Sequence, residues 1–202
     1  MRRVGKSPTA GAEIRRYDVG SLGNRRFPEQ QKLKTYKPLL RDVFRETGRY
    51  IREHRLRPVT YNVETKSKPE GDNVYNPPPE VFARLLYDEI IKGGMQKYVM
   101  IQSFDVRTLQ EFKKFPVRLP LVLLVENRDG VERNVERLGF RPDVYSPNYT
   151  LLDEQTVAYC HRRDIKVIPW TVNEPSDMEA LKKLNTDGII TDYPDRALRI
   201  FR

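Results

Sequence analysis

The sequence contains a single cysteine, Cys160, among its 202 residues. One cysteine excludes an internal disulfide framework, and its position in a predicted helix indicates a small buried hydrophobic residue rather than a nucleophile. Runs of eighteen apolar residues are also absent, so no membrane span is predicted. The N-terminal residues lack the apolar stretch of a signal peptide, and the sequence leaves the compartment open.

Histidines and phosphate-binding glycine motifs are scarce. The two histidines, His54 and His161, fall in basic helical segments away from any predicted strand end, so we expect neither to be catalytic. A glycine-rich loop after an early strand would indicate a dinucleotide-binding sheet, and the sequence has none.

The net charge of +9 is concentrated near the N-terminus, because residues 1–60 hold 16 Lys and Arg against 6 Asp and Glu. A basic segment of this kind is compatible with a solvated face, with a nucleic-acid or membrane surface, or with attraction of an anionic phosphodiester. The basic residues form no recognised nucleic-acid motif, so we expect no nucleic-acid partner. The oligomeric state stays open.

Short aliphatic or β-branched runs recur along most of the chain and alternate with segments of helical periodicity. They occupy residues 58–64, 98–103, 121–125, 143–146, 166–172 and 187–191. Strands that alternate with single helices predict a parallel α/β sheet with right-handed crossovers. Polar residues gather at the ends of these runs, which favours a (β/α)₈ TIM barrel, whose active site lies at the carboxyl ends of its strands.

Two regions are predicted along the chain. Residues 1–37 are polar and weakly periodic, which indicates an N-terminal loop segment, and residues 38–202 form the barrel domain. A helix is predicted at Lys37–His54, before the first strand. Within the barrel, Val81, Leu85, Leu86 and Ile90 are spaced as the buried stripe of a helix.

The candidate site residues lie at the ends of the predicted strands. Asn62, Glu64 and Lys66 alternate along one strand and so share one face. This pattern is typical either of a barrel mouth, with Glu64 on a divalent cation and Lys66 on an anion, or of an exposed edge strand with a Glu–Lys pair. Trp170 ends the strongest strand and is expected to wall a ligand pocket. Asp192 is expected either to act chemically or to cap the last helix.

Four segments together resemble the glycerophosphodiester phosphodiesterase family. They are Tyr61–Lys66, Ile101–Asp105, Trp170–Asn173 and Asp187–Pro194, whose order matches the third, fourth, seventh and eighth barrel strands of that family. The resemblance implies a phosphoric diester hydrolase of glycerol and lipid metabolism, which converts glycerophosphodiesters into glycerol 3-phosphate and an alcohol.

The resemblance also implies roles for single residues. It implies a divalent metal, Mg²⁺ or Ca²⁺, with Glu64 as a metal ligand and with Lys66 and Trp170 as substrate-binding residues. The family's two catalytic histidines and its further carboxylate ligands belong to strands one and two, and no matching motif occurs here. We therefore expect an incomplete barrel without its first two β/α units, inactive alone. The alternative is a non-catalytic domain that binds phosphate or glycerophosphate.

Overall fold

The computed structural model describes residues 8–201 and divides into two compact units between Pro58 and Val59. The sequence placed its boundary earlier, between residues 37 and 38. The first unit contains helix α1 (Pro8–Ile14) and helix α2 (Leu40–Glu53). Helix α1 corrects the expectation of a loop through residue 37, because a short helical turn forms within that polar segment.

Helix α2 confirms the helix predicted at Lys37–His54 and begins three residues later. Leu39 still has extended backbone angles and stands at the N-cap position. The buried carboxylate of Asp42 lies in the first turn of α2, where the helix dipole favours negative charge. It pairs with Arg45 of the same helix at 2.9 Å and with Arg15. Phe44 is the buried aromatic of this unit.

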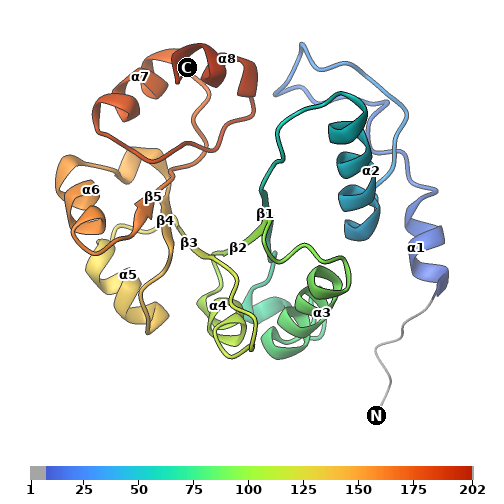
Figure 1. Cartoon of the computed structure of the whole chain (residues 1–202), viewed down its shortest axis with the longest axis horizontal. Coiled ribbons are helices and arrows are strands. Elements are labelled where there is room, and N and C mark those ends of the chain that lie inside the picture. Colours follow the sequence, from blue (N-terminus) through green and yellow to red (C-terminus); the bar gives the residue numbers. More distant parts are fainter. Residues whose placement is uncertain (1–7, 202) are drawn as a thin grey trace. The chain divides into compact units, whose positions relative to one another are not determined.

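The second unit is built on a sheet of five parallel strands. They are β1 (Tyr61–Glu64), β2 (Val99–Ser103), β3 (Leu121–Val125), β4 (Val144–Pro147) and β5 (Lys166–Val167), and they are neighbours in the order of the sequence. Right-handed crossovers between strands in sequential order place every connecting helix on the same face. Figure 1 shows α3 to α6 along the outer face of these strands. This arrangement is that of a barrel wall, since a doubly wound sheet would carry helices on both faces.

The helices of the second unit follow the strands in regular alternation. They are α3 (Pro79–Lys92), α4 (Val106–Phe112), α5 (Val131–Leu138), α6 (Glu154–His161), α7 (Pro175–Lys183) and α8 (Pro194–Ile200), with 3₁₀ turns at Pro69–Gly71 and Tyr149–Leu151. The run predicted at residues 187–191 is not a regular strand. Its backbone still pairs with the chain after β5, because Asp187 N donates to Val167 O and Ile190 N to Pro169 O. No helix among residues 8–201 is long and apolar enough to cross a bilayer.

The core lies between the sheet and its outer helices. Strand β3 is buried along its whole length, and alternate residues of β2, such as Ile101, face Leu109 and the other buried side chains of the helix layer. In α3 the buried face consists of Ala83, Leu86, Tyr87 and Ile90. The predicted stripe was therefore half wrong, because Val81 and Leu85 are 38% and 49% exposed.

Candidate functional site

The polar residues of strand β1 lie on one face of the strand, as their alternation in the sequence predicted. In the β1–β2 register Asn62 lies opposite Met100 and Glu64 lies opposite Gln102. Asn62 Nδ2 donates to Gln102 Oε1 at 2.6 Å, and Gln102 Nε2 reaches Glu64 Oε2 at 3.5 Å. The three side chains therefore share the inner face of the sheet. Gln102 is a member of this group that the sequence pattern did not single out.

Glu64 combines burial with an unused acceptor. Its side chain is 19% exposed, and Oε1 is buried without accepting a hydrogen bond from any described residue. Lys66 Nζ lies 2.7 Å from this oxygen, but outside the angular range of a hydrogen bond. The Glu–Lys pair expected for an edge strand is thus present, and the carboxylate it uses keeps a lone pair available to a cation.

A cavity of about 1030 Å³ opens at the carboxyl ends of β1, β2 and β3. Its walls come from the segments that follow these three strands, and the side chain of Glu64 forms part of the wall. The charged residues that line it are Glu64, Lys66, Lys68, Glu70, Asp105, Arg107, Glu126 and Arg137. A smaller hollow of about 470 Å³ lies between α5 and α6, away from the strand ends. Because ligands of α/β barrels bind at the carboxyl ends of the strands, the larger cavity is the candidate site.

A buried polar network fixes one wall of this cavity. Asp105 caps α4 by accepting a hydrogen bond from Arg107 N at 3.1 Å, and its second oxygen accepts from Ser67 Oγ at 3.1 Å. Ser103 Oγ accepts from Asp105 N at 3.0 Å and donates to Thr65 O at 3.3 Å. These bonds join the end of β1, the end of β2 and the start of α4 into one rigid corner.

Arg107 extends this corner to the loop between β1 and α3. Its guanidinium donates to Asp105 Oδ2 at 2.7 Å and makes two further bonds to the Asp72 carboxylate, at 2.7 and 3.2 Å. Burial raises the pKa of Asp105, but the hydrogen bonds from Arg107 outweigh it and leave that pKa below its usual value. The arginine therefore clamps the segment that carries Lys66. Sequence reasoning missed the clamp, although an aspartate two residues after a strand is a recognisable helix cap.

Trp170 contacts the wall of the cavity through the ring of another aromatic residue. Its Nε1 donates to Ser146 O at 2.9 Å, and its ring meets Phe104 edge to face with centroids 5.3 Å apart. Phe104 lines the cavity and Trp170 does not. The predicted pocket wall at Trp170 thus reaches the cavity through Phe104, an aromatic residue directly after β2 to which the sequence pattern assigned no role.

Three further candidates lie elsewhere. His161 Nε2 lies 2.9 Å from Asp187 Oδ2, which also accepts from Val167 N, so this histidine belongs to the amino-terminal end of the sheet. His54 stacks on Tyr50 within the first unit. Asp192 accepts from Asn173 Nδ2 at 3.0 Å and does not cap α8, whose N-cap position is held by Tyr193 without a side-chain bond.

The sequence model of the glycerophosphoryl diester phosphodiesterase family matches residues 8–196. The chain belongs to this family. Its curated relatives include the glycerophosphodiester phosphodiesterase of Bacillus subtilis, 27% identical over 91% of this chain and 61% of that protein. The enzyme of the same name from Caldanaerobacter subterraneus is 29% identical over 94% of this chain and 70% of its own length. The chain thus spans about three fifths of the Bacillus relative.

Solved structures agree with this assignment. A Silicibacter pomeroyi protein described as a glycerophosphoryl diester phosphodiesterase superposes with a TM-score of 0.76 at 27% identity, over 94% of this chain and 66% of that one. An Oleispira antarctica phosphodiesterase, solved with the product sn-glycerol-3-phosphate, gives 0.72 at 18% identity, over 94% and 69%. The barrel fold predicted from the sequence and the family resemblance are both confirmed.

The family is generally metal-dependent, so the fit of a cation was tested on the site. Residues 8–201 contain no group of three or more His, Cys, Asp or Glu side chains arranged around a common point. Among the described carboxylates, Glu64 is the one with a buried oxygen that accepts no hydrogen bond, and the Lys66 ammonium lies 2.7 Å from that oxygen.

Proposed function

We propose that this chain forms the substrate-binding wall of a metal-dependent glycerophosphodiester phosphodiesterase. The reaction is hydrolysis of a glycerophosphodiester to glycerol 3-phosphate and an alcohol. The observation that carries the proposal is Glu64, whose side chain lines a large cavity and whose buried Oε1 accepts no hydrogen bond from the described residues, with the Lys66 ammonium 2.7 Å away. The names of the relatives from Bacillus subtilis and Caldanaerobacter subterraneus support the same chemistry.

Each side chain of the wall has a distinct role in this proposal. Glu64 holds the cation, which we propose to be Mg²⁺ or Ca²⁺ because both prefer carboxylate oxygen. When bound, such an ion neutralises the charge of the phosphodiester. Lys66 binds a phosphate oxygen through its exposed ammonium group, and Phe104, supported by Trp170, covers the apolar part of the alcohol or glycerol.

The Arg107 clamp keeps Lys66 in place. Because Arg107 binds Asp72 and Asp105 together, the loop after β1 loses little further entropy when a ligand arrives. We expect the clamp to remain closed in the free and bound protein, since its two partners, Asp72 and Asp105, already use all three guanidinium nitrogens.

A second candidate function is binding of glycerophosphate without turnover. The observation that favours it is the position of His161, which lies at the amino-terminal end of β5, opposite the cavity. In this alternative the wall formed by Glu64, Lys66 and Phe104 binds a phosphate ester, and none of the described residues acts as a general acid or base.

One experiment separates the two functions. The purified chain is incubated with glycerophosphocholine and Mg²⁺ or Ca²⁺, and released glycerol 3-phosphate is measured, while calorimetry on the same preparation measures glycerol 3-phosphate binding. Product release that Glu64→Gln abolishes supports the phosphodiesterase. Because the chain is expected to be inactive alone, metal-dependent binding that Glu64→Gln abolishes also supports it. Saturable binding that requires neither the metal nor Glu64 supports the binding domain. Absence of both contradicts the proposed site.

A further inference from the structure

The first unit contains a closed loop whose side chains face solvent almost throughout. Between Ala12 and Pro38 only Gly20 and Phe27 are even partly buried. The loop is nonetheless well defined, because Asp18 Oδ1 accepts from the backbone N of Gly20, Ser21 and Thr35 at 3.0, 3.1 and 3.3 Å. Val19 N also donates to Thr35 O at 2.9 Å. We call residues 18–35 the Asp18 loop.

Gly20 shows how closely the two arms of the Asp18 loop approach each other. A Cβ atom at this position would lie 2.1 Å from Leu33 O and 2.8 Å from Thr35 Cγ2, so only glycine fits. The hydrogen bonds to Asp18 hold the pKa of this carboxyl well below its usual range. These backbone contacts therefore hold the Asp18 loop in one conformation, while nearly all of its side chains remain exposed.

The Asp18 loop exposes aliphatic side chains to solvent and also carries several positive charges. Leu22 is 92% exposed and Leu33 is 63% exposed, and Val19 is exposed beside them. Four cations accompany these side chains, Arg25, Arg26, Lys32 and Lys34, whereas Glu29 is the one acidic residue between positions 19 and 34. Leaving large aliphatic side chains in water forfeits the free energy of burial, so a surface that gathers them is expected to meet an apolar partner.

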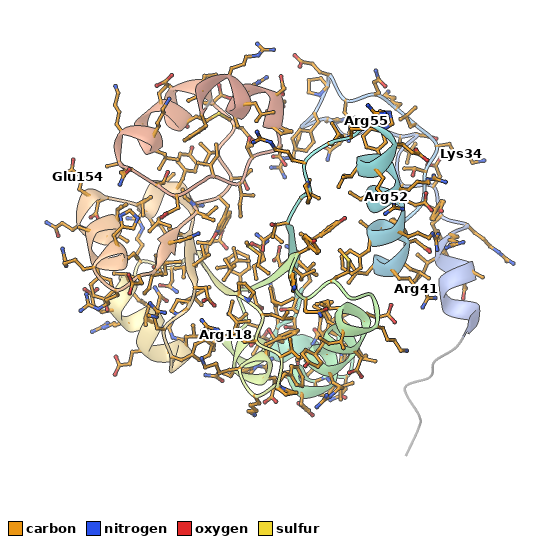
Figure 2. All side chains as sticks on the ribbon, in the orientation of Figure 1. Lys34, Arg41, Arg52, Arg55, Arg118 and Glu154 are labelled. Carbon is orange, nitrogen blue, oxygen red and sulfur yellow. The ribbon has the colours of Figure 1, made fainter. Side chains whose placement is uncertain are left out.

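Further cations of the same unit enlarge the positive surface. Figure 2 labels Lys34 on the Asp18 loop together with Arg41, Arg52 and Arg55, which come from α2 and its C-terminal end. Arg52 and Arg55 are exposed. The partner should therefore be anionic as well as apolar. Nucleic acids satisfy the first requirement, but single strands are bound through stacking on aromatic rings rather than through leucine.

We propose that the Asp18 loop docks on the surface of an anionic lipid bilayer. Leu22 and Leu33 enter the boundary between headgroups and acyl chains, and the lysines and arginines of the loop contact lipid phosphates. Charge complementarity selects this partner, and the exposed leucines favour it over nucleic acid, although Tyr17 and Tyr36 next to the loop are exposed as well. This docking does not depend on the proposed function.

Vesicle sedimentation tests the proposal with the whole chain. The protein is mixed with vesicles of phosphatidylcholine alone or of phosphatidylcholine with phosphatidylglycerol, and the bound fraction is measured over a range of salt. We expect binding to the anionic vesicles only, weakening as salt rises. Lys32→Ala with Lys34→Ala should lower the partition coefficient about thirtyfold, at about fivefold per cation. Leu22→Ser with Leu33→Ser should lower it by at least about tenfold.

Matched variants in the second unit serve as controls. Lys92→Ala with Lys97→Ala removes two exposed cations, and Val74→Ser with Tyr75→Ser removes two highly exposed apolar side chains. These controls should bind vesicles like the unchanged chain. Equal loss in loop and control variants would overturn the proposal, as would binding that is independent of anionic lipid.

Two further measurements test whether the loop instead binds nucleic acid or another copy of the chain. If a DNA duplex binds as tightly as the anionic vesicles, and the leucine variants bind both unchanged, the loop is a polyanion site and the proposal fails. If the leucines instead hold copies of the chain together, the leucine variants will change the molecular mass in solution without changing vesicle binding, which also contradicts the proposal.

Discussion

Lys66 Nζ lies 2.7 Å from Oε1 of Glu64, and yet this buried oxygen accepts no hydrogen bond within the described chain. The lysine is 78% exposed, so the pair is of the kind that contributes about 0–1 kcal/mol. A cation or a phosphate can therefore separate the pair at small cost, which leaves each partner available to a different part of one ligand.

Replacing this lysine should weaken anion binding and leave the fold intact. Lys66→Gln removes the ammonium group from the cavity wall, and we expect glycerol 3-phosphate to bind about tenfold more weakly, in line with the loss of one charge-assisted hydrogen bond. Calorimetry measures the change. Lys97→Gln removes a comparable exposed cation outside the cavity and should bind like the unchanged chain. An unaltered Kd for Lys66→Gln would exclude the lysine from the site.

The Arg107 clamp predicts a local effect on the loop after β1. Arg107→Lys keeps the charge but loses the planar fork that reaches Asp72 and Asp105 together. We expect a loss of about 1–3 kcal/mol in the free energy of unfolding and faster tryptic cleavage after Lys66 in the native protein.

Arg118→Lys is the matched control for the clamp, because Arg118 pairs with Asp143 at an exposed position. This variant should change neither the free energy of unfolding by more than about 0.5 kcal/mol nor the cleavage pattern. Cleavage of Arg107→Lys at the rate seen for the unchanged chain would show that the loop needs no clamp.

Acid should release the same clamp. The side-chain bonds from Arg107 hold the pKa of Asp72 below its ordinary value, and they do the same for Asp105 against the effect of burial. A depressed folded pKa stabilises the protein above the unfolded value of about 3.9, and this stabilisation disappears as pH falls through the folded pKa. Denaturant midpoints should therefore fall steeply below about pH 4. Asp105→Asn should lower the midpoint at neutral pH and flatten this acid limb; equal slopes would contradict the prediction.

Cys160 should be chemically silent in the native protein. Its side chain is fully buried, and burial raises the pKa of the thiol to about 12, so the reactive thiolate is not populated at neutral pH. A disulfide reagent should modify it only when denaturant unfolds the second unit. Rapid modification of the native chain would show that α6 opens or that the thiol is exposed.

Much of the fold was predictable because a parallel barrel repeats one simple pattern. Each of the first five predicted runs contains a strand, although the run at residues 166–172 is a strand only at Lys166–Val167. Strand β3 is buried on both faces, as expected for a parallel sheet, whereas β1 is partly exposed. The buried face of helix α3 was harder to predict, because the helix carries apolar residues on several of its faces. Periodicity alone does not show that Ala83 is buried and Leu85 is exposed. The pairing of residues 187–191 with the chain after β5 was correct in direction but too irregular to form a strand.

The sequence predicted only those site residues that lie together on a single strand. Alternation along β1 places Glu64 and Asn62 on the same face, and the contacts with Gln102 confirm this. Ser103, by contrast, is the last residue of β2, at a strand end of the kind from which the sequence predicted a polar barrel mouth. It is fully buried and bonds to Thr108 of α4, because odd positions of β2 face the helices. The clamp joins residues 35 positions apart, which no local pattern reveals.

The metal dependence of ligand binding at Glu64 tests the account most directly. Calorimetry compares the Kd for glycerol 3-phosphate with and without Mg²⁺ or Ca²⁺ in the unchanged chain, in Glu64→Gln, and in Glu70→Gln, which alters another carboxylate of the same cavity. We expect the metal to tighten binding by about tenfold or more in the unchanged chain and in Glu70→Gln, and to have no effect in Glu64→Gln. Metal-enhanced binding that survives in Glu64→Gln would contradict this expectation.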